Sequence, residues 1–320
     1  MNDIRLHRNL ALEFVRVTEA AAVAASSWIG RGDKNAADQA AVNAMREQLN
    51  KIDFHGKIVI GEGEKDEAPM LYTNEVVGKT KSPAVDLAVD PLECTDSVAH
   101  GRYNALTVIV AGPKGSLLHA PDLYMDKLAV GPACANLVDL DAPVADTIRK
   151  VAKALGKDKR EITVLVLDRE RHSKLIEEIR VAGARVRLIT DGDVAGAIAP
   201  SLEDNVIDIL MGIGASTEAV LAAAAIKIMG GQLFARFVPR DDRDKKALRH
   251  TGITNLNKVF SVEDLAKGDD LMFTATGVID GPLLKGVIVK KDRVITHSFA
   301  LRGITKTKRF ITTEQIKQSP

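Results

Sequence analysis

Residues 161–190 read EITVLVLDRERHSKLIEEIRVAGARVRLIT, and this stretch decides the fold class. Residues 162–167 are apolar apart from Thr163, and residues 185–190 place Val186, Leu188 and Ile189 among two arginines; both segments are rich in β-branched residues, which predicts two strands. Between them, residues 170–182 place apolar side chains at helical spacing among charged ones, which predicts an amphipathic helix. A strand, a helix and a second strand in this order are typical of a parallel α/β layer.

The same alternation continues on both sides of this stretch. In the second half of the chain we expect helices at 143–155, 194–199 and 216–229, and strands at 206–211 and 232–237. In the first half we expect helices at 9–29 and 35–50, strands at 57–60 and 84–90, and a hairpin of 106–111 with 117–119. Together these elements predict an α/β (α+β) fold of alternating helix and sheet layers, with a mostly parallel second half.

The composition argues against several classes of protein. Lys and Arg number 44 and Asp and Glu 43, so the net charge of +1 provides no global field that would attract nucleic acid or an anionic membrane. No apolar run approaches the roughly 20 residues that span a bilayer, and residues 1–8 lack the core of a signal peptide. The two cysteines cannot form a disulfide scaffold. We therefore expect a cytoplasmic enzyme that binds neither nucleic acid nor membranes.

Acidic residues gather at the ends of expected strands. The strand at 84–90 leads into Asp90, Glu93 and Thr95, and the preceding strand leads into Glu62 between two glycines. Glycine lets the backbone bend tightly without a Cβ penalty. Asp90, Glu93 and Thr95 can converge at the carboxyl end of one strand, where ligands collect in open α/β sheets.

This acidic pattern has a chemical consequence and a plainer alternative. Several carboxylates that lie close together repel one another unless a cation neutralises them. Hard oxygen ligands suit Mg²⁺ or Mn²⁺ rather than zinc, and such ions hold phosphoryl oxygens and activate water. The alternative is that the acids only solvate surface loops, which applies best to the charge run at 64–67.

Strands and helices are expected to alternate regularly only after about residue 140, and we therefore expect the chain to have three parts. Residues 1–140 form an N-terminal α+β half that binds metal, and residues 141–270 form an α/β half that carries substrate-binding loops. Residues 271–320 are rich in strand-forming residues, and we expect them to return and pack on the N-terminal half.

Six segments, in order along the chain, resemble the class II fructose-1,6-bisphosphatases. They are GRGDKNAAD at 30–38, IVIGEGE at 58–64, VDLAVDPLE at 85–93, HAPDLYM at 119–125, DGD at 191–193 and TATGV at 274–278. The resemblance runs from about residue 9 to about residue 302, which is nearly the whole chain. It implies the layered fold of the lithium-sensitive, metal-dependent phosphatase superfamily.

The resemblance also implies roles for individual residues. The matching metal ligands are Asp38, Glu62, Asp90, Glu93 and Glu218. The residues implied to take part in catalysis are Thr95, Asp38, Glu62 and Lys34. The residues implied to contact the substrate are Glu93, Cys94, Thr95, Tyr124, Arg169, Glu170, Arg171, Asp191, Gly192, Asp193 and Ala215.

By the same resemblance, the reaction is hydrolysis of the 1-phosphate of fructose 1,6-bisphosphate in gluconeogenesis, with Mn²⁺ or Mg²⁺ as cofactor. Metal-activated water attacks the phosphate, and Thr95 with Asp38 or Glu62 orients that water or removes its proton. Arg169 or Arg171 clamps the distal phosphate, because a guanidinium fork matches two phosphate oxygens. The family also implies a homo-oligomer, a dimer or a tetramer.

Two departures from the family pattern keep other functions open. Cys94 replaces a glycine, which costs strain of about 1–3 kcal/mol if the backbone there requires a positive φ. Residues 214–219 read GASTEA, where the family has GGAPEG. The alternatives are a dual fructose-1,6-/sedoheptulose-1,7-bisphosphatase and a catalytically weakened sugar-phosphate-binding regulatory protein. A dinucleotide-binding dehydrogenase is a poorer fit, because Gly61-x-Gly63 lacks the third glycine of that fingerprint.

Overall fold

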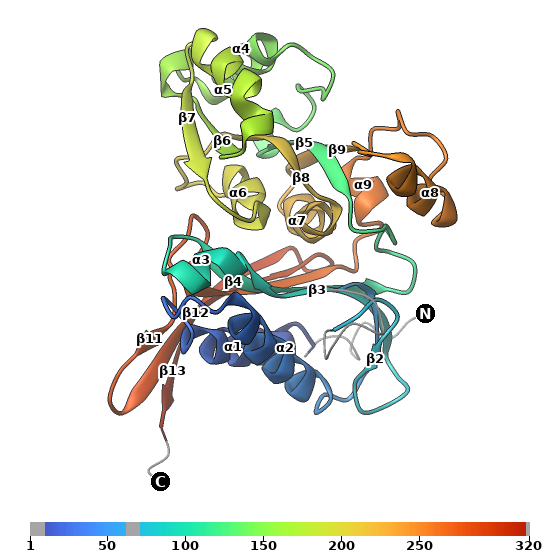
Figure 1. Cartoon of the computed structure of the whole chain (residues 1–320), viewed down its shortest axis with the longest axis vertical. Coiled ribbons are helices and arrows are strands. Elements are labelled where there is room, and N and C mark those ends of the chain that lie inside the picture. The colour runs from blue at the N-terminus through green and yellow to red at the C-terminus, as the bar shows by residue number, and fades with distance from the viewer. Residues whose placement is uncertain (1–9, 62–70, 318–320) are drawn as a thin grey trace. The chain divides into compact units, whose positions relative to one another are not determined.

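The structure, a computed structural model, describes residues 10–61 and 71–317. Its chain divides into two compact units (Figure 1). Unit 1 comprises Met1–Leu117 and Gly268–Pro320, and unit 2 comprises Leu118–Lys267. Each unit contains helices and its own mixed sheet, so the α+β fold class expected from the sequence is confirmed.

The sheet of unit 1 is assembled from both ends of the chain. Its order in the described residues is β11-β12-β10-β4-β3-β1-β2, with β13 paired to β12. The strands are β1 (His55–Ile60), β2 (Val76–Val77), β3 (Ala84–Glu93), β4 (Ala105–Pro113), β10 (Met272–Ile279), β11 (Ile288–Val289), β12 (Arg293–Arg302) and β13 (Thr307–Ile316). β1 and β3 run parallel, and β10 joins the C-terminal strands to β4 in antiparallel register.

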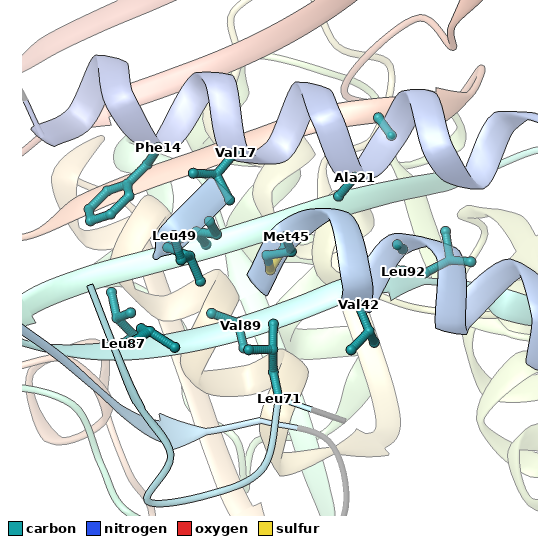
Figure 2. Packing of buried hydrophobic residues seen from close by; sticks show 14 of the residues in the cluster. Phe14, Val17, Ala21, Val42, Met45, Leu49, Leu71, Leu87, Val89 and Leu92 are labelled. Atoms are coloured by element: carbon teal, nitrogen blue, oxygen red, sulfur yellow. The ribbon is translucent and has the colours of Figure 1, made fainter. Parts of the chain in front are cut away.

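The long helices of unit 1, α1 (Leu10–Ser26) and α2 (Lys34–Leu49), pack against this sheet (Figures 1 and 2). Phe14 and Val17 of α1 meet Met45 of α2 and Leu87 of β3 in one buried apolar cluster (Figure 2). Asp33 starts α2, because its carboxylate accepts a hydrogen bond from the backbone N–H of Ala36. A short helix, α3 (Thr95–His100), follows β3.

Unit 2 holds a five-stranded sheet in the order β7-β6-β8-β5-β9. The strands are β5 (Tyr124–Val130), β6 (Thr163–Leu167), β7 (Arg185–Ile189), β8 (Ile209–Ala215) and β9 (Gln232–Phe237). The helices are α4 (Val144–Leu155), α5 (Ser173–Val181), α6 (Val194–Ile198), α7 (Ser216–Ile228), α8 (Asp242–His250) and α9 (Val262–Leu265). Short 3₁₀ segments are η1 (Pro132–Cys134), η2 (Lys159–Glu161), η3 (Glu170–His172) and η4 (Ala199–Ser201).

The expectation of a mostly parallel second half holds only for β7, β6 and β8. The sequence reading did not include β5, which lies between β8 and β9 and runs antiparallel to both. Because β5 belongs to this sheet, unit 2 begins at Leu118 instead of near residue 140. The expected hairpin at 117–119 is also absent among the described residues, since β4 pairs with β3 and β10 instead.

None of the helices in the described part of the chain combines the length and the apolar composition needed to cross a membrane.

Candidate functional site

In unit 2, the loops that carry the expected substrate residues leave one edge of the sheet. The parallel strands β6, β7 and β8 all end at this edge, and their loops carry the residue groups 169–171, 191–193 and 215–218. The antiparallel strand β5 starts at the same edge, because Tyr124 lies opposite Ala215 in the ladder. Ligands in open α/β sheets bind outside the carboxyl ends of such strands.

A buried lysine lies in mid-strand on β5, three residues in from this edge. Lys127 of β5 is only 1% exposed, and its ammonium nitrogen lies 2.8 Å from both carboxylate oxygens of Asp193. The same nitrogen lies 3.9 Å from Oε2 of Glu218, on the first turn of α7. A Cβ at Gly214 would lie 2.2 Å from Oδ2 of Asp193 and 2.8 Å from the Lys127 nitrogen. Only glycine at position 214 leaves room for this ion pair.

Burial dominates the electrostatics of Glu218. Loss of solvent raises the pKa of its carboxyl from the usual 4.5 to about 7, although the nearby Lys127 ammonium acts in the opposite direction. The Asp193 carboxylate adds to the rise, because two like charges disfavour each other. The charged form of Glu218 is therefore only partly compensated by Lys127, and a second cation would stabilise it.

Asp191 and Asp193 occupy different surroundings. Asp193 is 3% exposed, and Lys127 hydrogen-bonds to both of its oxygens. The carboxylate of Asp191 is more accessible, and the guanidinium of Arg169 lies 3.8 Å from it. Of the two, Asp191 is the one whose oxygens can face a sugar hydroxyl, and Asp193 holds the buried lysine.

Arginines surround Tyr124 at the start of β5. Arg171 donates a hydrogen bond of 2.8 Å to the carbonyl oxygen of Ile213, and its guanidinium carbon lies 4.7 Å from the Tyr124 ring centre. A second guanidinium, that of Arg240, lies 5.2 Å from the same ring centre. Both contacts fall within the range of cation–π attraction. Sequence reasoning identified Arg171 but not Arg240.

His172 fixes the loop after β6 to β8. Its Nδ1 donates to the carbonyl oxygen of Leu167 at 2.7 Å, and its Nε2 accepts from the backbone N–H of Ile213 at 2.7 Å. This pattern requires the neutral ring with its proton on Nδ1. Burial lowers the pKa of the imidazole, which favours the same neutral form. These two hydrogen bonds give the histidine a structural role, and the ring holds neighbouring Arg171 at the sheet edge.

In unit 1, the expected site residues come from the start of α2 and the end of β3. Lys34 and Asp38 lie one helical turn apart on α2, and Lys34 forms an exposed ion pair of 3.6 Å with Asp96. Oδ1 of Asp90 accepts a hydrogen bond from the backbone N–H of Leu92 at 3.1 Å. Glu93 is buried at the end of β3, and Thr95 opens α3. Glu62 lies outside the described residues.

The backbone at Cys94 is left-handed, with φ +73° and ψ +49°. Glycine favours this region because a Cβ there approaches the following carbonyl oxygen, at a cost of about 1–2 kcal/mol. The thiol is buried, and its sulfur accepts a hydrogen bond from the side-chain amide of Asn104 at 3.4 Å. The substitution that the sequence marks as a departure therefore does carry backbone strain.

The donor chemistry fits a hard divalent cation. All five expected ligands are carboxylates, the ligand type that Mg²⁺ and Mn²⁺ prefer. Among the described residues, no donor hydrogen-bonds to the buried Oε2 of Glu218, which leaves that oxygen able to meet a cation. Within the described ranges, no group of three or more His, Cys, Asp or Glu side chains is arranged to hold a metal. Glu62 lies outside those ranges, and the other four expected ligands are divided between the two units.

Sequence reasoning missed the buried Lys127 in the middle of β5. Its signal lies in the alternation of Met125, Lys127 and Ala129, which by period two share one face of the strand. Met125 and Ala129 are fully buried, so a lysine between them is a buried charge that requires a partner.

Comparisons with known proteins cover almost the whole chain. A family model described as bacterial fructose-1,6-bisphosphatase, glpX-encoded, matches residues 8–315. Fructose-1,6-bisphosphatase class 2 of Haemophilus influenzae is 46% identical over 318 residues, which is 96% of each chain. Fructose-1,6-bisphosphatase 1 class 2 of Escherichia coli K12 is also 46% identical over 318 residues, covering 96% of this chain and 95% of the relative. The similarity therefore includes both units.

Proposed function

The chain belongs to the family of bacterial, glpX-encoded fructose-1,6-bisphosphatases, and we propose on this premise that it hydrolyses the 1-phosphate of fructose 1,6-bisphosphate. The products are fructose 6-phosphate and phosphate, so the chain is a phosphoric monoester hydrolase of gluconeogenesis. The observation that carries this conclusion is the 46% identity, over 96% of the chain, with enzymes of that name.

The enzyme is metal-dependent, and we propose Mn²⁺ or Mg²⁺ as its ion. The residues that would hold it are Asp38, Glu62, Asp90, Glu93 and Glu218. When bound, such an ion supplies an activated water and neutralises charge on the phosphoryl oxygens. Two observations support this assignment: no donor among the described residues hydrogen-bonds to Glu218 Oε2, and the expected ligands are all carboxylates.

The remaining roles belong to the chain's own side chains. Thr95, with Asp38 or Glu62, would orient the attacking water or accept its proton, and Lys34 would contribute positive charge. Arg169 and Arg171 are exposed at the sheet edge, where they can hold the distal phosphate. Asp191 would accept hydrogen bonds from sugar hydroxyls. The other proposed contacts with the substrate are Glu93, Cys94, Tyr124, Glu170, Gly192, Asp193 and Ala215.

Two properties stay predictions from the family resemblance and the composition. One is assembly into a dimer or a tetramer, which light scattering coupled to size-exclusion chromatography measures. The other is a cytoplasmic location, which fractionation of the source cells measures.

A phosphate-release assay tests the function. Wild-type enzyme should release one equivalent of phosphate from fructose 1,6-bisphosphate with Mn²⁺ or Mg²⁺ and none after chelation. Glu218→Gln should lose most of this activity, because an amide is a poorer ligand for a hard cation than a carboxylate. The matched control is Glu178→Gln on the exposed face of α5, which should leave the rate unchanged. Wild-type protein that releases phosphate from no sugar bisphosphate with either ion would overturn the proposal.

A further inference from the structure

Two guanidinium groups from distant parts of unit 2 lie over one aromatic ring. Arg171 follows β6, Arg240 follows β9, and the ring is that of Tyr124 at the start of β5. The two guanidinium carbons lie 4.7 Å and 5.2 Å from the same ring centre. Their separation therefore cannot exceed the sum of these distances, about 10 Å. A phosphate between them would lie within reach of both, since each guanidinium–phosphate hydrogen bond spans about 2.8 Å.

Arg240 is held in place from two sides. The backbone N–H of Val238 donates to the carbonyl oxygen of Tyr124 at 2.8 Å, which ties this segment to β5. The buried carboxylate of Asp244 accepts the backbone N–H of Arg240 at 2.9 Å and its Nε at 3.0 Å. A guanidinium has five N–H donors, so Arg240 keeps donors for a second anion. The arginine is thus oriented before any ligand arrives.

The charges around the ring favour an anion. Asp244 offsets the charge of Arg240, whereas Arg171 forms no ion pair with any carboxylate in the described residues. Its one hydrogen bond among these residues goes to the neutral carbonyl oxygen of Ile213. The π face of Tyr124 attracts each cation but carries no net charge. Arg171, Arg240, Asp244 and Tyr124 together therefore carry a net positive charge at an accessible edge of the sheet. An anionic ligand there can accept hydrogen bonds from both guanidinium groups.

We propose that Arg240 is a specificity-determining residue that binds the distal phosphate of the substrate together with Arg171, across the ring of Tyr124. The ligand is a sugar phosphate whose phosphate lies remote from the scissile bond. The inference rests on the proposed function and extends it. Arg240 distinguishes bisphosphates from monophosphates that lack the distal group and takes no part in the chemical step.

The test compares two substrates that differ only in the distal phosphate, fructose 1,6-bisphosphate and fructose 1-phosphate. Arg240→Gln should lower kcat/KM for the bisphosphate by about 10- to 100-fold, the range for a lost hydrogen bond to a charged group. It should change kcat/KM for fructose 1-phosphate by less than about twofold, and Arg240→Lys should be intermediate. The matched control is Arg243→Gln in the same segment, whose side chain is 94% exposed and paired with Asp241. Both substrates should be unaffected in this control.

Calorimetric titration with the product fructose 6-phosphate gives a readout that does not depend on turnover. Arg240→Gln should weaken this binding by a factor similar to the loss of kcat/KM for the bisphosphate. An equal loss with both substrates would mean a general structural role and would overturn the inference, as would unchanged kinetics with the bisphosphate. Failure of the proposed function looks different, because wild-type enzyme would then not hydrolyse the bisphosphate at all.

Discussion

The ammonium nitrogen of Lys127 lies 2.8 Å from each carboxylate oxygen of Asp193, and both side chains are almost completely buried. Taking two charges out of water costs several kcal/mol for each ion, and the attraction between them offsets this only in good geometry. Such a pair adds little stability compared with apolar packing. Its position beside Glu218 therefore indicates that it serves the site, where it fixes one carboxylate next to another.

Breaking the Lys127–Asp193 pair should destabilise the protein severely. Lys127→Met leaves Asp193 buried without its partner, and we expect a loss of about 3–5 kcal/mol in the free energy of unfolding. The control is Lys157→Met, which breaks an ion pair with buried Asp208 from a lysine that is 37% exposed. Urea denaturation should show a smaller loss there, because water can replace the missing ammonium. Equal losses in the two variants would contradict this account.

Glu218 should make the metal-free protein less stable as the pH rises. Its folded pKa of about 7 lies above the usual 4.5, so the folded state binds more protons than the unfolded state between these values. The free energy of unfolding therefore falls through this window. Glu218→Gln should be more stable than wild type at pH 8 by at most about 3 kcal/mol and about equal at pH 4. Urea titrations in a chelator measure the difference, and a gap that does not depend on pH would contradict it.

His172 should make stability fall on the acid side. Burial lowers its pKa below the usual 6.5, so near and below pH 6.5 the unfolded state binds a proton that the folded state does not. Stability is therefore fully present above this range and declines as the pH falls through it. A protonated ring also cannot accept the Ile213 N–H. His172→Gln should be less stable at pH 8 but should lose less stability between pH 7 and pH 5 than wild type does. Parallel pH profiles would contradict this.

The sequence predicted β6 and α5 of the alternating stretch well, because β6 is almost entirely apolar and α5 is amphipathic. β6 and α5 lie within a few residues of their expected places. The sequence did not predict β5, because residues 123–130 (LYMDKLAV) contain Asp126 and Lys127 inside an apolar run, and charged residues usually indicate exposed loops. Its antiparallel course is a tertiary property that no local pattern encodes.

The residues of the candidate site also fall into those that the sequence predicted and those that it did not. Asp90 and Glu93 lie in the last part of β3, so their place at the end of a strand identifies them, whereas Arg169 and Arg171 after β6 were identified by the family resemblance. Lys127 lies in mid-strand, and its role depends on Asp193, 66 residues away. Arg240 likewise depends on Tyr124, which precedes it by more than a hundred residues. Pairings over such separations follow from strand order, which the sequence pattern leaves open.

The left-handed backbone at Cys94 makes glycine the better residue there in conformational terms. Cys94→Ala keeps the Cβ and its strain and loses the buried thiol that accepts the Asn104 hydrogen bond. Cys94→Gly loses the same thiol but relieves the strain, which is worth about 1–2 kcal/mol. We therefore expect the glycine variant to be more stable than the alanine variant by about 1 kcal/mol in urea denaturation. The control is Ala99→Gly in α3, where the backbone is helical and glycine should instead cost about 0.5–1 kcal/mol. An alanine variant at least as stable as the glycine variant would show that the strain at Cys94 is negligible, and the family's glycine at this position would then need an explanation in the close approach of substrate.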